Sequence, residues 1–255
     1  MGWSCLSTAA SRPSEFTPDR GTWLIRGNYR VHGRRTANPA PLKAGGININ
    51  TDRRSIVSYA IVGFGAVGQA LTHAFARKNI DVTVASRRPP EALAKQARAI
   101  GPTVVAKSLQ DALEADTIIL AVPFEEHHEV AKALPNWAGK TVIDAMNTLI
   151  PLEELDGLLS SAFVAKAFTG AKVAKAFNHL IAATLATDPA VEGGHRVVFL
   201  SSDDEDSTVP VAALAKQLGF APVKLGKLNE GGALVHARGR IWGQLIFQDL
   251  FKKEQ

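Results

Sequence analysis

The feature that most constrains the fold is a glycine-rich turn between a short apolar run and an apolar helical pattern. The segment Gly63-Phe64-Gly65-Ala66-Val67-Gly68 follows directly on the strand-like run 59–62 and has the spacing G-x-G-x-x-G. The helical face after it is apolar and consists of Val67, Ala70, Leu71, Ala74 and Phe75. A second strand pattern at 81–85 completes a strand, helix and strand unit, which indicates a parallel α/β sheet.

Each glycine has a separate physical role in such a unit. Gly63 permits a tight turn, Gly65 lets the main chain approach a pyrophosphate, and Gly68 lets helix and strand pack closely. The pyrophosphate then lies on the free amides and the positive dipole of the helix N-terminus. The pattern therefore predicts a dinucleotide site, and this context disfavours the alternative that the glycines serve only a turn. Its expected cofactor-binding residues are Gly63, Phe64, Gly65, Ala66, Val67 and Gly68.

The second strand ends in a basic turn. A unit that binds NAD places Asp or Glu here, about 20 residues past the glycine loop, to bind the ribose 2′-hydroxyl. This chain has Ser86-Arg87-Arg88 instead, and the first acid after them is Glu91. A hydroxyl and guanidinium groups bind a 2′-phosphate through charge-assisted hydrogen bonds, and a guanidinium also stacks on adenine. We therefore predict NADP(H), with Lys95 as a more distant phosphate contact; a solvated basic turn is the alternative.

From residue 58 onward, short apolar runs alternate with helical patterns. Strands are expected at 58–62, 81–85, 103–106, 117–121, 140–144, 172–176, 195–200 and 221–225. Helices are expected at 66–78, 90–99, 108–113, 125–133, 152–167, 179–185, 205–218 and within 231–251. The predicted fold class is α/β, with a doubly wound, mostly parallel Rossmann-type sheet and a small C-terminal helical cap.

Residues 1–54 differ from the rest in charge and pattern. They hold nine Lys or Arg against three Asp or Glu, a net charge of +6, whereas the remaining residues carry a net charge of −1. They show no sustained apolar periodicity and no signal-peptide apolar block. We expect a disordered basic N-terminal extension, 1–54, before one NADP-binding domain, 55–255. A transit segment and a misassigned start codon both remain as explanations of this extension.

Composition excludes several classes of function. The chain has 46% hydrophobic and 21% charged residues, and no apolar run of the roughly 18 residues that cross a bilayer, so no membrane span is expected. Because the positive charge lies in 1–54, the domain lacks the broad field that a nucleic acid would follow. Cys5 is the one cysteine, which excludes a disulfide within the chain and is typical of a cytoplasmic protein.

The domain shows no motif for metal or covalent nucleophilic chemistry. The patterns H-E-x-x-H, C-x-x-C and G-x-S-x-G are absent from the sequence. His127-His128 is the nearest approach to an acid/base pair, and we interpret it as part of a polar helix face. No side chain is therefore assigned as catalytic, and no metal is expected.

Five segments of the domain form a combined pattern: 60–65 with its continuation, 85–88, 120–123, 142–147 and 173–178. Together they resemble the NADP-dependent reductases of coenzyme F-420, a deazaflavin hydride carrier, whose fold also forms the cytoplasmic part of the STEAP metalloreductases. The resemblance spans 58–250, and its most family-specific element is Lys175-Ala176-Phe177-Asn178.

The resemblance implies where the nicotinamide lies. Its border is formed by the loops after the fourth and fifth expected strands, Ala121-Val122-Pro123 and Ala145-Met146-Asn147. Both loops follow the carboxyl ends of strands, where open α/β sheets bind ligands. Asn147 either orients the carboxamide or caps a turn, and Asn178 either lines the second substrate's pocket or caps the helix at 179–185. The segment 231–242, which in the family shapes the acceptor pocket, is cationic and aromatic here and leaves the acceptor open.

The function implied by this resemblance is hydride transfer between NADPH and a small molecule, either coenzyme F-420 or a flavin-like acceptor. Orientation of two stacked rings supplies most of the rate of such a step, which agrees with the lack of a catalytic dyad. Two alternatives stay open: an NADPH-binding redox sensor without turnover, and a relative of β-hydroxyacid dehydrogenases or imine reductases. A homodimer through the apolar C-terminal helix is considered beside packing of that helix on its own sheet.

Overall fold

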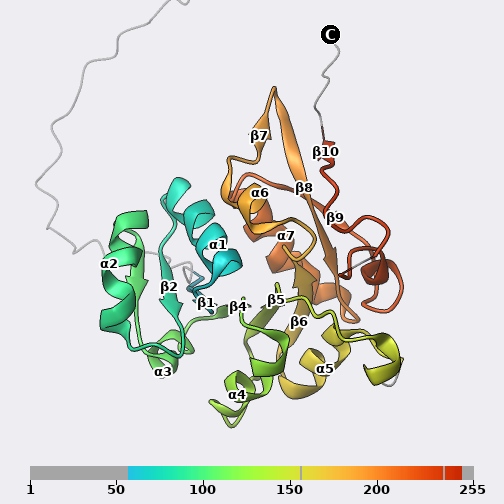
Figure 1. The fold of residues 1–255 in the computed structure, drawn as a ribbon, viewed down its shortest axis with the longest axis horizontal. Coiled ribbons are helices and arrows are strands. Elements are labelled where there is room, and N and C mark those ends of the chain that lie inside the picture. The colour runs from blue at the N-terminus through green and yellow to red at the C-terminus, as the bar shows by residue number, and fades with distance from the viewer. Residues whose placement is uncertain (1–56, 156, 238, 249–255) are drawn as a thin grey trace, which may run out of the picture. The chain divides into compact units, whose positions relative to one another are not determined.

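The described part of the chain forms a ten-stranded sheet flanked by helices (Figure 1). The computed structural model describes residues 57–155, 157–237 and 239–248; the expected extension, 1–54, lies outside them. The strands are β1 (Tyr59–Val62), β2 (Val82–Ala85), β3 (Val104–Ala106), β4 (Thr117–Leu120), β5 (Thr141–Asp144), β6 (Lys172–Ala176), β7 (Ala190–Val191), β8 (Gly194–Ser201), β9 (Ala221–Lys224) and β10 (Phe247–Gln248).

Six strands form a parallel array in the order β3-β2-β1-β4-β5-β6. This is the order of a doubly wound dinucleotide-binding sheet, so the predicted Rossmann-type fold is confirmed. Beyond it, β8 runs antiparallel to β6, and β9 runs parallel to β8. The strand order reverses between β1 and β4: β2 and β3 follow on one side of β1, and β4 to β6 follow on the other. This reversal creates a crevice outside the carboxyl ends of β1 and β4.

Helices cover both faces of the sheet. One face packs against α1, α2, α6 and α7, and the other packs against α3, α4 and α5. The α-helices are α1 (Ala66–Arg77), α2 (Pro90–Ile100), α3 (Leu109–Ala112), α4 (His127–Lys132), α5 (Ser160–Ala167), α6 (Ala182–Ala186) and α7 (Thr208–Gln217). The 3₁₀-helices are η1 (Phe124–Glu126), η2 (Leu152–Leu155), η3 (Glu205–Ser207) and η4 (Gly231–Leu234).

The central strands are apolar because both of their faces are covered. Every residue of β4 and β5 is buried, as expected for parallel strands between two helical layers. Side chains alternate between the layers: Ile61, Ile119 and Ile143 face α1, whereas Ala60, Ile118 and Val142 face α4 and α5. This packing fixes the positions of the loops that leave β1, β4 and β5.

The C-terminal part of the secondary-structure prediction was partly wrong. In place of one helix within 231–251, the described residues contain η4, a series of turns and β10, which pairs antiparallel with β8. Gly243 has a φ of +79°, a left-handed conformation that ends any helix there. The expected helix at 152–167 likewise divides into η2 and α5.

Candidate functional site

Two cavities lie near the loops that follow β1, β4 and β5, and the larger of these two, of about 750 Å³, lies at the carboxyl ends of β1 and β4. It occupies the crevice at the reversal of strand order, where doubly wound sheets bind nucleotides. Nine of the cofactor-binding residues expected from three separate motifs line it: Gly63, Phe64, Gly65, Ser86, Arg87, Arg88, Ala121, Val122 and Pro123. The rest of the lining is Val62, Leu109, Glu126, Glu129 and Val130.

The three glycines of the loop have different surroundings. A Cβ on Gly63, whose φ is +106°, would clash with the carbonyl of Ala121, and a Cβ on Gly68 would clash with the carbonyl of Gly63. A Cβ on Gly65 would meet no atom within 4 Å. Gly63 and Gly68 are thus required by packing, whereas Gly65 leaves open the place where a pyrophosphate approaches the main chain.

The start of α1 has the properties of a phosphate site. Gly65 is its N-cap, no side chain caps the helix, and its first turn contains no acid. Ala66, Val67 and Gly68 form that turn beside the cavity but are not among the residues that line it. The unoccupied amides and the helix dipole therefore fit an anionic pyrophosphate.

The two adjacent arginines of the basic turn after β2 differ in their ion pairing. Arg87 Nη1 forms an ion pair with Glu126 Oε1 at 2.7 Å, across the cavity lining from β2 to η1. Arg88 forms no ion pair among the described residues, and its main-chain N–H donates to Ser86 Oγ at 3.1 Å. The Ser86 hydroxyl and the Arg88 guanidinium thus face the cavity without a carboxylate partner.

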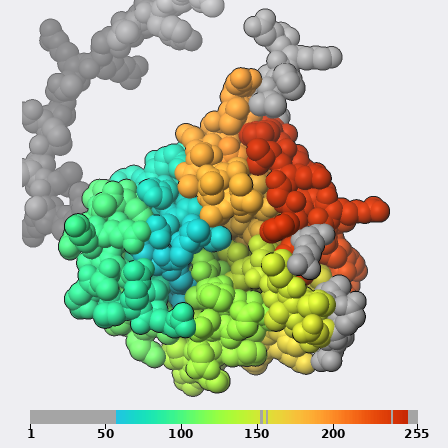
Figure 2. All heavy atoms as spheres, in the orientation of Figure 1, coloured from blue at the N-terminus to red at the C-terminus, as the bar shows by residue number. Residues whose placement is uncertain are grey.

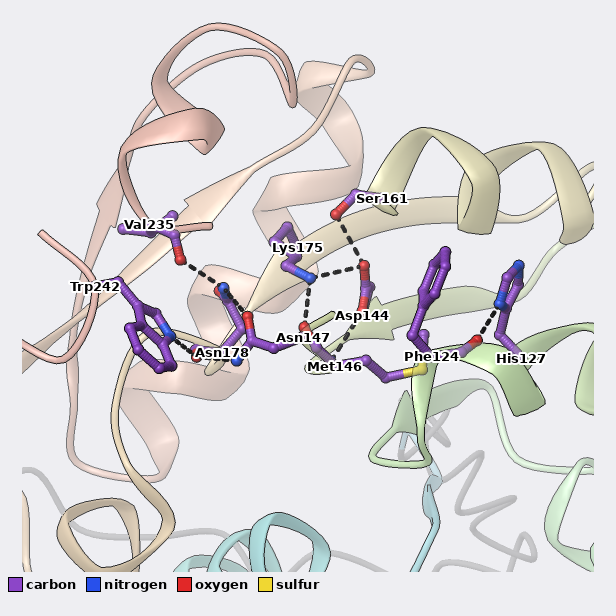
Figure 3. Close-up of polar contacts among 10 residues, drawn as sticks. All are labelled: Phe124, His127, Asp144, Met146, Asn147, Ser161, Lys175, Asn178, Val235 and Trp242. Carbon is purple, nitrogen blue, oxygen red and sulfur yellow. Dashed lines mark hydrogen bonds and ion pairs between the residues drawn. The ribbon is translucent and has the colours of Figure 1, made fainter. Parts of the chain in front are cut away.

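The loop after β5 lies outside this cavity and is held by a buried polar network (Figure 3). Asp144 accepts hydrogen bonds from Lys175 Nζ at 3.0 Å, Ser161 Oγ at 2.9 Å and the Met146 N–H at 2.9 Å. Lys175 also donates to the Met146 carbonyl. Ala145 and Met146 are buried, so they support the loop from inside, and Asn147 is its half-buried member.

Asn147 and Asn178 bind each other (Figure 3). Asn147 Nδ2 donates to the Asn178 carbonyl at 2.7 Å, and Asn178 Nδ2 donates to Asn147 Oδ1 at 3.2 Å and to the Val235 carbonyl at 2.8 Å. The N-cap of α6 is Ile181, so the predicted capping role of Asn178 was wrong. The two amides instead connect the carboxyl ends of β5 and β6 to the C-terminal segment.

Phe177, between β6 and Asn178, has a left-handed backbone conformation. Its φ is +62° and its side chain is fully buried against Phe220. A bulky residue adopts this conformation only when the surrounding structure imposes it, and such outliers gather at functional sites. The strain marks the end of β6, next to the loop after β5.

The two adjacent histidines lie in different environments. His127 is buried, contacts the Phe124 carbonyl through Nδ1 and stacks on the Phe124 ring, whereas His128 is exposed. Burial lowers the pKa of His127 below its usual value. The predicted polar helix face therefore applies to His128 and was wrong for His127.

The smaller cavity, of about 300 Å³, lies between the loop 148–151 and the C-terminal segment. Its lining on the C-terminal side consists of Ala233, His236, Ala237 and Gly239. In Figure 2 the C-terminal segment, coloured red, lies against the yellow region that contains this loop. His236 lines the cavity, its Nδ1 donates to the Ala237 carbonyl at 3.0 Å, and burial is the main cause that lowers its pKa. This arrangement places an imidazole beside the smaller cavity.

Sequence reasoning missed four side chains of these networks, Glu126, Asp144, Ser161 and Lys175. Glu126 carried no motif, and Asp144 and Lys175 were quoted only as parts of resembling segments. A charged residue inside an otherwise apolar parallel strand, as Lys175 is in β6, was the signal that could have revealed the buried pair.

The comparison with sequence families agrees with this geometry. Residues 58–148, which contain β1 to β5 and the loop after β5, match the family described as NADP oxidoreductase, coenzyme F-420-dependent. This part of the chain is thus similar in sequence to that family of oxidoreductases. The match includes all residues that line the larger cavity.

Relatives of known structure extend the likeness beyond the family match. A hypothetical protein from Sinorhizobium meliloti is 39% identical, with a TM-score of 0.73 over 77% of this chain and 98% of that one. A proposed F-420-dependent NADP-reductase from Arthrobacter sp. FB24 is 27% identical, with a TM-score of 0.57 over 68% of this chain and 86% of that one.

Among curated proteins, the metalloreductase STEAP2 of Mus musculus is 30% identical over 186 residues, which is 72% of this chain and 36% of that protein. The chain thus spans about a third of the length of the STEAP metalloreductases it matches. Within the described residues, no helix is long and apolar enough to span a membrane. The same residues contain no group of three or more His, Cys, Asp or Glu that would hold a metal ion.

Proposed function

We propose that this protein is an NADP-dependent oxidoreductase, which binds NADPH in the larger cavity and transfers its hydride to a deazaflavin such as coenzyme F-420 or to a flavin-like acceptor. The observation that carries the proposal is the convergence of three motifs, from the ends of β1, β2 and β4, on one cavity of about 750 Å³. Their separation in sequence makes this convergence a property of the fold rather than of one local turn.

Each end of the cavity suits a different part of the dinucleotide. The open space at Gly65 and the start of α1 suit the pyrophosphate, and Ser86 with Arg88 suits the 2′-phosphate. Arg87 would reach the phosphate after leaving Glu126, or would stack on adenine while it stays paired. The nicotinamide would then lie toward Ala121-Val122-Pro123 and the loop after β5.

Bound NADPH supplies the chemistry: a ring C–H bond breaks, and its hydrogen and electron pair pass to the acceptor, which also takes up a proton from solvent while NADP⁺ forms. The chain has to hold the two rings face to face and to exclude water. His127 is not needed for this step, since it lines neither the larger nor the smaller cavity. The acceptor ring would lie beside the half-buried Asn147, toward the smaller cavity.

The acceptor class is tested with the purified chain and NADPH against coenzyme F-420, FMN, FAD and a ferric chelate in parallel. We expect turnover with coenzyme F-420 or a flavin, measured as loss of nicotinamide absorbance. NADH in the same panel controls for cofactor selectivity. Tight NADPH binding without consumption in any mixture would contradict the enzyme proposal and favour a redox sensor, and turnover with the ferric chelate alone would replace the acceptor.

A further inference from the structure

The main chain of Met146 is held from both sides by a buried ion pair. Asp144 accepts from the Met146 N–H at 2.9 Å, and Lys175 donates to the Met146 carbonyl at 2.5 Å, while the two side chains bind each other at 3.0 Å (Figure 3). The side chains of Lys175 and Asp144 are 4% and 1% exposed. A third bond, from Ser161 Oγ at 2.9 Å, fixes the carboxylate to α5.

Such a pair is a poor source of stability. Desolvation of two buried charges offsets most of their attraction, and apolar residues of similar volume often leave a protein as stable or more stable. The bonds to Met146 are different in kind, because apolar replacements cannot provide them. The specific effect of the pair is therefore on the position of the loop.

Two further features fix the same region. Asn147 is bound to Asn178 through two hydrogen bonds, and Phe177 keeps a strained left-handed backbone beside them. The ends of β5 and β6 thus form one immobilised unit, in which every member of the loop after β5 is buried or bonded. Pre-organisation of this kind is expected where a reacting ring has to be oriented.

We propose that Asp144 and Lys175 are positioning residues for hydride transfer, which act by fixing Met146 and Asn147 beside the nicotinamide. This inference rests on the proposed function. Because both side chains are buried, they act through the loop and not by contact with the ring. A displacement of about 1 Å at such a position costs on the order of a hundredfold in rate.

The test compares Lys175→Met, Asp144→Asn and the double variant with the unchanged chain. Lys175→Met leaves Asp144 without its counter-ion and lowers both the free energy of unfolding and kcat. The double variant removes both charges, so it regains stability relative to Lys175→Met but not kcat, because no donor reaches the Met146 carbonyl. We expect kcat in the double variant to fall by about tenfold or more, with an unchanged Kd for 2′,5′-ADP, which binds only the phosphate end.

Ser202→Ala is the matched structural control. Its hydroxyl donates to the carbonyl of Val173 at 2.6 Å, so the variant loosens the same strand, β6, at its other end. We expect it to lose stability and to keep kcat. A second readout, the fluorescence anisotropy of bound NADPH, should fall in the double variant and not in Ser202→Ala.

Recovery of both kcat and stability in the double variant would overturn the inference. A loss of kcat in Ser202→Ala as large as that in the double variant would overturn it as well. Failure of the unchanged chain to bind NADPH or 2′,5′-ADP would instead sink the proposed function. Nucleotide binding by the unchanged chain therefore distinguishes failure of the proposed function from failure of this inference.

Discussion

At the residue scale, the cavity contains positions that look alike in sequence and differ in what they tolerate. Gly63 and Gly68 each lie against backbone, whereas Gly65 faces open space. Arg87 is paired with a carboxylate, and Arg88 has no ion pair among the described residues. These differences arise from neighbours that folding brings close. They show which residues of one motif serve the structure and which are available to a ligand.

The two glycines give a paired test of this separation. Gly65→Ala should cost at most about 1 kcal/mol of unfolding free energy and weaken NADPH binding by about tenfold or more, because the methyl group occupies the pyrophosphate position. Gly63→Ala should lower the unfolding free energy by about 2 kcal/mol or more through its positive φ and the clash with Ala121. Thermal unfolding and NADPH titration measure both. Equal stability losses in the two variants would contradict the assignment.

The buried His179 should make stability depend on pH. It is fully buried, packs edge-to-face on Phe199 at 4.9 Å, and burial lowers its pKa from 6.5 to about 4. Below pH 6.5 the unfolded chain gains a proton that the folded chain excludes, so unfolding free energy should fall as the pH drops from 6.5 toward 4. The full effect is about 3 kcal/mol.

His179→Phe should remove this part of the pH dependence, with the exposed His128→Gln as control. Denaturant unfolding at about pH 7 and about pH 5 provides the comparison. An unchanged pH dependence in His179→Phe would refute the role of this residue.

At the element scale, β2 and η1 are connected across the cavity by the Arg87–Glu126 pair, whose side chains are 81% and 30% exposed. A bound 2′-phosphate would compete with Glu126 for Arg87. An exposed ion pair contributes little energy, so loss of Glu126 should change the affinity for NADPH only modestly. Substitution of a neighbouring acid that does not line the cavity provides the control that makes this change measurable. Sequence could not reveal it, because Arg87 and Glu126 lie 39 positions apart.

Glu126→Gln should tighten NADPH binding by about two- to fivefold and leave NADH binding unchanged, because the arginine is released for the phosphate. Glu125→Gln, an exposed neighbour in η1 that does not line the cavity, is the control. Titration of both nucleotides into both variants gives the result. Weaker binding of both nucleotides to Glu126→Gln would mean that Glu126 holds Arg87 over adenine instead.

At the scale of the whole molecule, the parallel half of the sheet could be predicted from the sequence and the C-terminal part only partly. Strands β1 to β6 are short apolar runs separated by helical patterns, and burial on both faces keeps that signal strong. The residues after β9 had helical apolar spacing at Ile241, Trp242 and Leu245, but Gly243 turns the chain and Trp242 and Leu245 are partly exposed. The polar network around Lys175 depends on contacts between distant segments, which periodicity cannot report.

All residues that line the larger cavity lie within 62–130. A chain that starts at residue 55 should therefore bind NADPH with the same Kd as the full chain. Titration of both forms checks this, with far-UV circular dichroism as a control for folding. A loss of affinity on removal of 1–54 would show that the extension contributes to the site.

We infer that the larger cavity selects NADPH over NADH through the 2′-phosphate. Calorimetric titration of NADPH and NADH into the unchanged chain and into Arg88→Ala tests it most directly. We expect NADPH to bind at least about tenfold more tightly than NADH, and Arg88→Ala to lose most of this preference while its affinity for NADH stays the same. Equal affinity for the two nucleotides, or equal losses for both in Arg88→Ala, would contradict it.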